Sequence, residues 1–165
     1  MNLAHTAVCI ARFLADESLV FVADDDQQAE ALACALRALL PHGAIVFLPS
    51  SDTLPGDVAA ASPANIGRRV AALRSLRKLQ QQPERYPVVL LLSGEAIARR
   101  YPAPEAFDAA PPALHPGDPF EAMAFKKQLL DLGYFADDRI DEPGEMALRG
   151  NVIDLFPADA GLPAR

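Results

Sequence analysis

Two short apolar runs near the end of the chain enclose a charged turn. Met146 and Leu148 precede Arg149, Gly150 and Asn151, and the apolar residues 152, 153 and 155 follow them. Glycine at such a bend supplies the positive φ that a tight hairpin connection requires. Arg149 stands directly before the turn, where its planar guanidinium can donate paired hydrogen bonds to a carboxylate or phosphate of a partner. A solvated arginine beside a turn would show the same pattern. The sequence therefore predicts a hairpin and makes Arg149 a candidate contact residue.

Residues for hydrolytic or acid–base chemistry occur, but they are scattered along the chain. A hydrolase requires a nucleophile within reach of a histidine. The candidates are Ser50, Ser51, Asp52 and Asp57 in one loop, and His5, His42 and His115 on a helix, at a helix end and in a linker. The carboxylate pairs at 137–138 and 141–142 are better explained as solvated loop charges than as acid–base pairs. We expect no catalytic site in this chain.

The sequence also lacks the usual signals of phosphate and metal sites. A nucleotide-binding loop ends in Gly-Lys-Ser/Thr, and no glycine of this sequence is followed by lysine. Residues 24–26 are consecutive aspartates, which are more typical of a helix cap than of a metal site. Cys9 and Cys34 lie in apolar helical patterns without CxxC spacing, so we expect buried thiols instead of metal ligands. No cofactor is therefore expected.

Charge and composition argue against further classes of protein. The net charge is −7 and only three lysines occur, whereas a nonspecific nucleic-acid binder needs clustered basic residues. The basic residues of the helix expected at 63–80 are typical of a solvated face: Arg68, Arg69, Arg74, Arg77 and Lys78. No stretch has the length of a membrane span or the pattern of an export signal. We expect a protein of the reducing cytoplasm.

The elements that must position these residues divide the chain into two domains. Helices and strands are predicted in alternation up to about residue 100, which indicates the α/β class, a parallel sheet with helices on both faces. The expected helices are 3–15, 27–40, 63–80 and 94–100, and the expected strands, as apolar runs buried in the sheet, are 19–23, 44–48 and 88–92. The strand at 19–23 is expected to be buried on both faces. Residues 102–116 are typical of a linker, so the first domain is expected at 1–111.

The second domain, at 112–165, is expected to be a small α+β unit. Its helix is predicted at about 120–132, with Gly133 just beyond the helix end. An extended segment at 134–141 then leads into the hairpin.

Three segments of the chain resemble the bacterial transcription-repair coupling factors, the Mfd family. They are Leu48-Pro49 through Asp52-Thr53-Leu54-Pro55-Gly56-Asp57, Ser62-Pro63 through Arg68-Arg69 and Leu73, and Gly133-Tyr134 through Gly144-Glu145, Arg149-Gly150, Ile153-Asp154, Phe156-Pro157 and Pro163 to Arg165. Together they span about two thirds of the chain, in the order and spacing of that family's N-terminal region. The third segment is also similar to UvrB of nucleotide excision repair, and the first two favour the coupling factors.

The resemblance implies a UvrB-like module whose second domain binds UvrA. The first domain would be a degenerate relative of a helicase ATPase domain that lacks the Walker A phosphate loop. Arg149 and Arg165 would face UvrA, Gly150 would form the turn, and Asp154 would hold Arg149 in place. The fragment itself would have no catalytic activity and no cofactor. ATP, magnesium, DNA and RNA polymerase would bind other domains of a longer DNA translocase, and this region would recruit UvrA to stalled transcription.

Some features depart from the family's pattern. Gly56 replaces a frequent aromatic residue, and Met146 stands where Phe or Tyr is usual. The chain also stops at Arg165, before a strand expected to complete the second domain. We therefore expect a fragment with an open sheet edge that is partly disordered or pairs between copies. Two alternatives stay open: a piece of UvrB or another helicase whose phosphate loop lay upstream of Met1, and a related protein that does not bind UvrA.

Overall fold

The computed structural model describes residues 2–14, 17–54, 56, 60–82 and 87–165 of the chain. Its contacts divide the chain into two compact units. The first comprises Met1–Ser51 and Arg69–Asp108, and the second comprises Asp52–Arg68 and Ala109–Arg165. Residues 52–68 thus group with the second unit, although the expected first domain, 1–111, included them.

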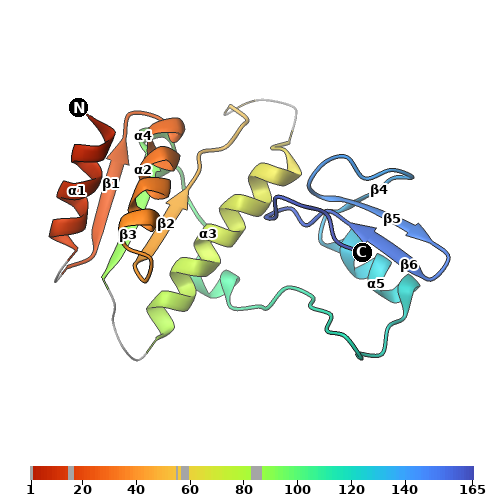
Figure 1. Ribbon diagram of the computed structural model, residues 1–165. Coiled ribbons are helices and arrows are strands. Elements are labelled where there is room, and N and C mark those ends of the chain that lie inside the picture. The colour runs from red at the N-terminus through yellow and green to blue at the C-terminus, as the bar shows by residue number, and fades with distance from the viewer. Residues whose placement is uncertain (1, 15–16, 55, 57–59, 83–86) are drawn as a thin grey trace. The chain divides into compact units, whose positions relative to one another are not determined.

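A three-stranded parallel sheet forms the centre of the first unit (Figure 1). Its strands are β1 (Leu19–Ala23), β2 (Ala44–Leu48) and β3 (Val88–Ser93), and β3 lies between the other two. Each strand is one of the predicted apolar runs. Such runs suit a parallel sheet because helices can bury both of its faces. The expected α/β class is confirmed.

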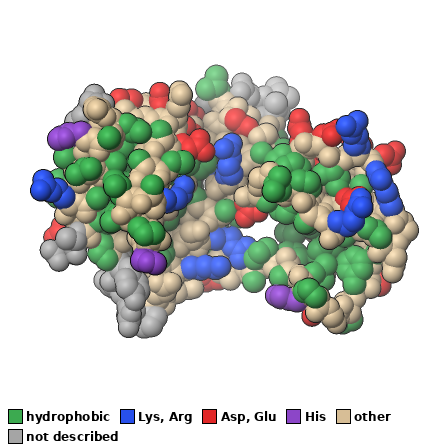
Figure 2. Space-filling view, in the orientation of Figure 1, with side chains coloured by type: hydrophobic (Ala, Val, Ile, Leu, Met, Phe, Trp, Pro, Cys, Tyr) green, Lys and Arg blue, Asp and Glu red, His purple; other side chains and the backbone are tan. Residues whose placement is uncertain are grey.

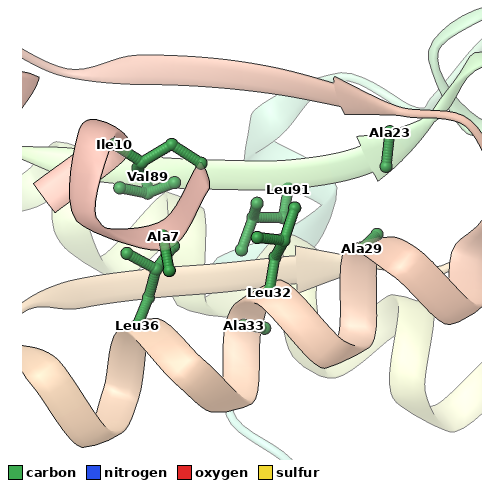
Figure 3. Packing of buried hydrophobic residues seen from close by; sticks show 9 residues of the cluster. All are labelled: Ala7, Ile10, Ala23, Ala29, Leu32, Ala33, Leu36, Val89 and Leu91. Atoms are coloured by element: carbon green, nitrogen blue, oxygen red, sulfur yellow. The ribbon is translucent and has the colours of Figure 1, made fainter. Parts of the chain in front are cut away.

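Helices pack on opposite faces of this sheet. The elements are α1 (Leu3–Phe13), α2 (Asp26–Leu39), the part of α3 (Pro63–Gln81) from Arg69 onward, α4 (Gly94–Ile97) and the 3-10 helix η1 (Pro104–Phe107). On one face α1 and α2 pack against Val89 and Leu91 of the central strand, and Figure 3 shows Leu32 of α2 pointing toward Leu91. On the other face Ala72 of α3 joins a core with alternate residues of β2 and β3, such as Val46. The alternation of side chains along the strands thus supplies two cores.

The strand β1 is buried on one face instead of the expected two. Its residues Val20 and Val22 are 55% and 47% exposed. They share a face with Leu90 and Leu92, their partners in β3. The core beneath α3 is built on β2 and β3, so this face of β1 remains accessible in the described part of the chain.

Two local expectations for the first unit are also wrong. Cys34 is exposed and Cys9 is half-buried, because α2 turns residues 29, 32, 33 and 36 toward the sheet and leaves Cys34 on its outer side. The helix α4 ends at Ile97 and not near residue 100. The Ala96 carbonyl accepts a hydrogen bond from the Tyr101 hydroxyl at 2.8 Å, which satisfies a group at the end of this short helix.

A small mixed sheet and a helix form the core of the second unit. The helix is α5 (Ala122–Asp131), and the strands are β4 (Phe135–Ala136), β5 (Glu145–Arg149) and β6 (Val152–Leu155), in the order β4-β5-β6. β4 is parallel to β5, and β5 is antiparallel to β6. The helix contacts β6 (Figure 1), and Leu129 and Met146 are buried. The expected small α+β unit is confirmed, although the segment expected to be extended over 134–141 forms a strand only at Phe135–Ala136.

The C-terminal end lies alongside β6. Ala164 and Leu155 exchange two backbone hydrogen bonds, of 2.7 and 2.8 Å. β6 is therefore paired with the C-terminal end at Leu155, whereas the sequence predicted an open sheet edge in this domain. This pairing brings the last residue of the chain next to Asp154.

Candidate partner-binding site

A two-residue turn joins β5 and β6 and places Arg149 at the tip of the hairpin. The register pairs Arg149 with Val152, which leaves Gly150 and Asn151 as the turn. Gly150 has a φ of +64°, and Asn151 does not have a positive φ. Glycine in the first central position is the requirement of a type II′ turn, whose twist matches that of the flanking strands. The predicted hairpin is confirmed.

Arg149 and Asp154 lie on the same face of the sheet. Directly opposed residues of antiparallel strands share a face, and side chains alternate along each strand. Because Arg149 pairs with Val152 and Ala147 pairs with Asp154, Asp154 lies diagonally across from Arg149. The alternate residues form the apolar face: Met146, Leu148, Ile153 and Leu155. The hairpin therefore presents a charged face opposite an apolar one.

Arg165 joins this face from the C-terminal end of the chain. Its Nε donates to Asp154 Oδ1 at 2.5 Å, and its second nitrogen donates to Oδ2 at 3.0 Å. Arg165 is thus bound to the carboxylate that lies diagonally across the strands from Arg149. We call Arg149, Asp154 and Arg165 the arginine face.

Arg149 itself is held by the backbone. It is exposed, and a guanidinium nitrogen donates to the Asp138 carbonyl oxygen at 2.6 Å. The sequence led us to expect Asp154 to hold Arg149, but Asp154 forms its hydrogen bonds with Arg165. The role of Asp138 was missed, since a backbone acceptor leaves no signal in residue type.

The charges of the arginine face are coupled. The hydrogen bond from Arg165 lowers the pKa of Asp154, and the positive charges of Arg165 and, to a smaller extent, Arg149 add to this effect. The same hydrogen bond raises the pKa of Arg165. Asp154 is therefore ionised at neutral pH, and the face carries two positive charges and one negative charge.

The surroundings of the arginine face mix apolar and charged groups. Val152, opposite Arg149 in the register, is 46% exposed. Figure 2 shows basic and acidic side chains interspersed over the second unit in the view drawn. In the 137–142 loop, Asp137 accepts a hydrogen bond from the Asp138 N–H at 2.6 Å. Glu145 of β5 accepts from the N–H groups of Asp141 and Glu142. Such a surface suits a specific contact in which a few charges determine how the two partners align.

Of the aspartates at 24–26, Asp25 is the N-cap of α2. Asp25 accepts a hydrogen bond from the Gln28 N–H at 2.7 Å at the start of α2. Asp26 accepts from both the N–H and the hydroxyl of Ser50, at 2.7 and 2.8 Å. Among the described residues, no cluster of three or more histidines, cysteines and carboxylates could hold a metal ion. Nor does any helix in the described ranges have the length and apolar character that a membrane span requires.

The candidate hydrolase residues make local contacts with other groups. His5 lies 3.6 Å from Cys9 on α1, and His115 contacts Asp118. Asp52 accepts hydrogen bonds from the N–H and the hydroxyl of Ser62, and the Ser62 hydroxyl lowers the pKa of Asp52. Asp57 and the motif residue Pro55 lie outside the described residues. These contacts are those of turns and helix ends.

Part of the basic stripe on α3 is bound to its own unit. Arg77 forms a two-nitrogen ion pair with Asp108, with Nε 2.6 Å from Oδ1, and Gln81 donates to the same carboxylate. The guanidinium of Arg69 lies 5.8 Å from the centre of the Tyr101 ring, within the range of a cation–π contact. Two residues of the stripe, Arg69 and Arg77, therefore make contacts within the first unit.

Comparison with known proteins gives a match within the second unit. Residues 113–165 match the family of the UvrB interaction domain. The matched range contains α5, the sheet β4-β5-β6 and the whole arginine face.

The whole chain is also similar to proteins described as transcription-repair-coupling factors. It is 28% identical to that of Mycobacterium bovis over 165 residues, which cover 98% of this chain and 13% of the relative. It is 28% identical to that of Haemophilus influenzae over 146 residues, which cover 88% of this chain and 12% of the relative. For Bacillus subtilis the identity is 25% over 138 residues, with 84% and 11% covered. The chain thus spans 11 to 13% of the length of these relatives, and its resemblance to the coupling factors is confirmed.

Proposed function

We propose that this chain is a docking module that recruits UvrA of nucleotide excision repair through the arginine face. The observation that carries the proposal is that Arg149 and Arg165 lie on the face of Asp154, within the range that matches the UvrB interaction domain. Arg165 is hydrogen-bonded to Asp154, and Arg149 acts on it through its charge. In this proposal the module belongs to a longer cytoplasmic coupling factor, whose other domains bind RNA polymerase, DNA, ATP and magnesium. The chain itself acts by binding and performs no catalysis.

The chemistry of the face suits such a contact. Arginine carries a planar fork of donors that matches a carboxylate in two-point geometry, and it is less strongly hydrated than lysine. Arg149 has one nitrogen on the Asp138 carbonyl, so its guanidinium is oriented before a partner arrives. A side chain that is already oriented loses less conformational freedom on binding. The exposed Val152 beside it can be buried in the same contact.

A titration of bacterial UvrA against this chain and its Arg149→Ala variant tests the proposal. We expect saturable binding by the parent chain and a loss of about 2 to 4 kcal/mol, roughly 30-fold or more in Kd, in the variant. The matched control is Arg37→Ala, which removes an exposed arginine of α2 in the other unit and should leave Kd unchanged. Equal affinities of all three proteins would refute a role of the arginine face. No binding by the parent chain would favour the alternative of a related protein with another partner.

A further inference from the structure

A glycine within α3 makes a close contact inside the second unit. Glycine is among the least favourable residues of a helix interior, yet Gly67 lies in the helix Pro63–Gln81. A Cβ built on Gly67 would lie 2.5 Å from both the carbonyl carbon and the Cβ of Ala158, and 2.6 Å from the carbonyl oxygen. Real Cβ atoms do not approach backbone so closely. The start of α3 and Ala158 therefore touch through a position that only glycine fits.

A second contact of the same kind lies one helical turn earlier. A Cβ on Gly144 would collide with the side chain of Pro63, the first residue of α3. Gly144 has a φ of +93°, and its N–H donates to the Phe156 carbonyl at 2.8 Å. The beginning of α3 thus meets the backbone on both sides of the hairpin, before β5 and after β6.

The first turn of α3 is itself fixed at its start. The Ser62 hydroxyl accepts a hydrogen bond from the Asn65 N–H at 3.2 Å, as an N-cap residue does. Asp52 in turn accepts from the Ser62 N–H and hydroxyl. Asn65 is buried. These contacts leave residues 62–68 little freedom to move away from Ala158.

Ala158 is where the chain leaves the hairpin and begins its return to β6. Its N–H donates to the Tyr134 hydroxyl at 3.2 Å. The chain comes back at Ala164, which pairs with Leu155, and ends at Arg165 on Asp154. The location of Ala158 therefore determines where the return segment starts, and the return segment carries Arg165.

We infer that residues 62–68, the start of α3, position the arginine face. Through the contact of Gly67 with Ala158, these residues hold the segment 156–165 so that Arg165 reaches Asp154. The matched range 113–165 is therefore an incomplete description of the interaction surface, because its support includes residues that precede the range by about fifty positions. The effect on UvrA binding rests on the proposed function; the structural effect does not.

The first test measures the structural effect without UvrA. Hydrogen exchange at the amides of Leu155 and Ala164 reports whether the return segment is paired, since each amide donates to the other residue. We expect Gly67→Ala to speed exchange at both amides roughly tenfold or more. The control is Gly94→Ala in α4, where an added Cβ meets nothing within 4 Å. In this variant, exchange at the amides of Leu155 and Ala164 should remain as in the parent chain. Unchanged exchange in Gly67→Ala would overturn the inference.

The second test asks whether Gly67 acts through Arg165. We expect Gly67→Ala to weaken UvrA binding roughly tenfold, and to have no further effect when Arg165 is already alanine. Combined with Arg149→Ala, it should add its full effect. Additivity with Arg165→Ala would overturn the positioning role. If neither arginine variant changes the affinity, the proposed function fails, and the exchange experiment still decides the inference.

A milder variant guards against failure of Gly67→Ala to fold. Tyr134→Phe removes the hydroxyl that accepts from the Ala158 N–H and keeps the aromatic ring. It should speed exchange at Leu155 and Ala164 in the same direction but by a smaller factor, about threefold. Exchange equal to that of the parent chain would contradict the inference independently of Gly67.

Discussion

The two units use their polar side chains in different ways. In open α/β sheets, ligands commonly bind in the crevice at the carboxyl ends of the strands. In the first unit, Asp25 after β1 and Ser93 at the end of β3 cap helices, and Ser50 after β2 donates a hydrogen bond to Asp26 of α2. In the second unit, the hairpin instead keeps two arginines on one face.

The difference shows how a scaffold and a binding surface can be separated within one chain. Asp25 and Ser93 accept hydrogen bonds from N–H groups of the helices that they cap, and these interactions need no partner. Arg149 has one nitrogen on a carbonyl oxygen and remains exposed, so its guanidinium can still meet a partner. The comparison predicts that changes in the first unit alter stability, and that changes in the arginine face alter binding.

The largest expected effect is on stability, in the first unit. Leu32 of α2 is 1% exposed and packs in the core with Leu91 and Ala7 (Figure 3). Leu32→Ala should lower the free energy of unfolding by about 2 to 5 kcal/mol, because it removes buried methyl groups and leaves a cavity. Urea denaturation followed by circular dichroism measures this change.

The control for Leu32 lies on the same helix. Leu39 of α2 is 50% exposed, so Leu39→Ala should lower the free energy of unfolding by less than about 1 kcal/mol. Both variants should bind UvrA with the affinity of the parent chain under conditions where they are folded. Weaker UvrA binding by folded Leu32→Ala would show that the core of the first unit affects binding as well as stability, which contradicts the comparison.

A smaller effect is expected when Arg149 keeps its charge but loses its shape. Arg149→Lys retains the positive charge but not the planar fork, and lysine is more strongly hydrated. We expect Arg149→Lys to weaken UvrA binding by about 1 to 1.5 kcal/mol, roughly tenfold. Its affinity should thus lie between that of the parent chain and that of Arg149→Ala. Full affinity in the lysine variant, measured by the same titration, would mean that charge alone accounts for the contact.

The elements of both units were largely predictable, because they depend on local patterns. The apolar runs 19–23, 44–48 and 88–92 and the hairpin around Gly150 are present in the structure. The exposure of Val20 and Val22 was not predictable from their own run. It depends on which strands α3 covers, and this is a property of packing between distant segments.

The arginine face was predictable in part. The turn and Arg149 could be identified from the hairpin signature, whereas Arg165 entered only through the family resemblance. Its link to Asp154 depends on the return of the chain at Ala164, a contact that no periodicity encodes. The contribution of Gly67 had one sequence signal, a glycine inside a helical pattern, but its contact with Ala158 required the structure.

The smallest effect is expected in the titration of Asp154. This titration measures how strongly each arginine of the arginine face favours the ionised form of Asp154. The hydrogen bond from Arg165 lowers the pKa of Asp154, and the charge of Arg149 makes the smallest contribution. Arg165→Ala should therefore raise the pKa of Asp154 most of the way to its ordinary value, and Arg149→Ala should raise it less. The chemical shift of the Asp154 carboxyl carbon, followed by NMR as pH is lowered, distinguishes the two. An equal shift in both variants would show that Arg149 and Arg165 contact the carboxylate alike.

The sign of the stability effect follows from the same titration. Because the pKa of Asp154 is lowered in the folded state, its pairing with Arg165 stabilises the fold above the ordinary carboxyl pKa. This contribution disappears as pH falls through the lowered value. The stability difference between the parent chain and Arg165→Ala should therefore be present at neutral pH and shrink in acid. The difference in stability could instead stay constant down to the lowest pH at which the chain folds. Arg165 would then stabilise the chain through packing of its side chain and not through its ion pair with Asp154.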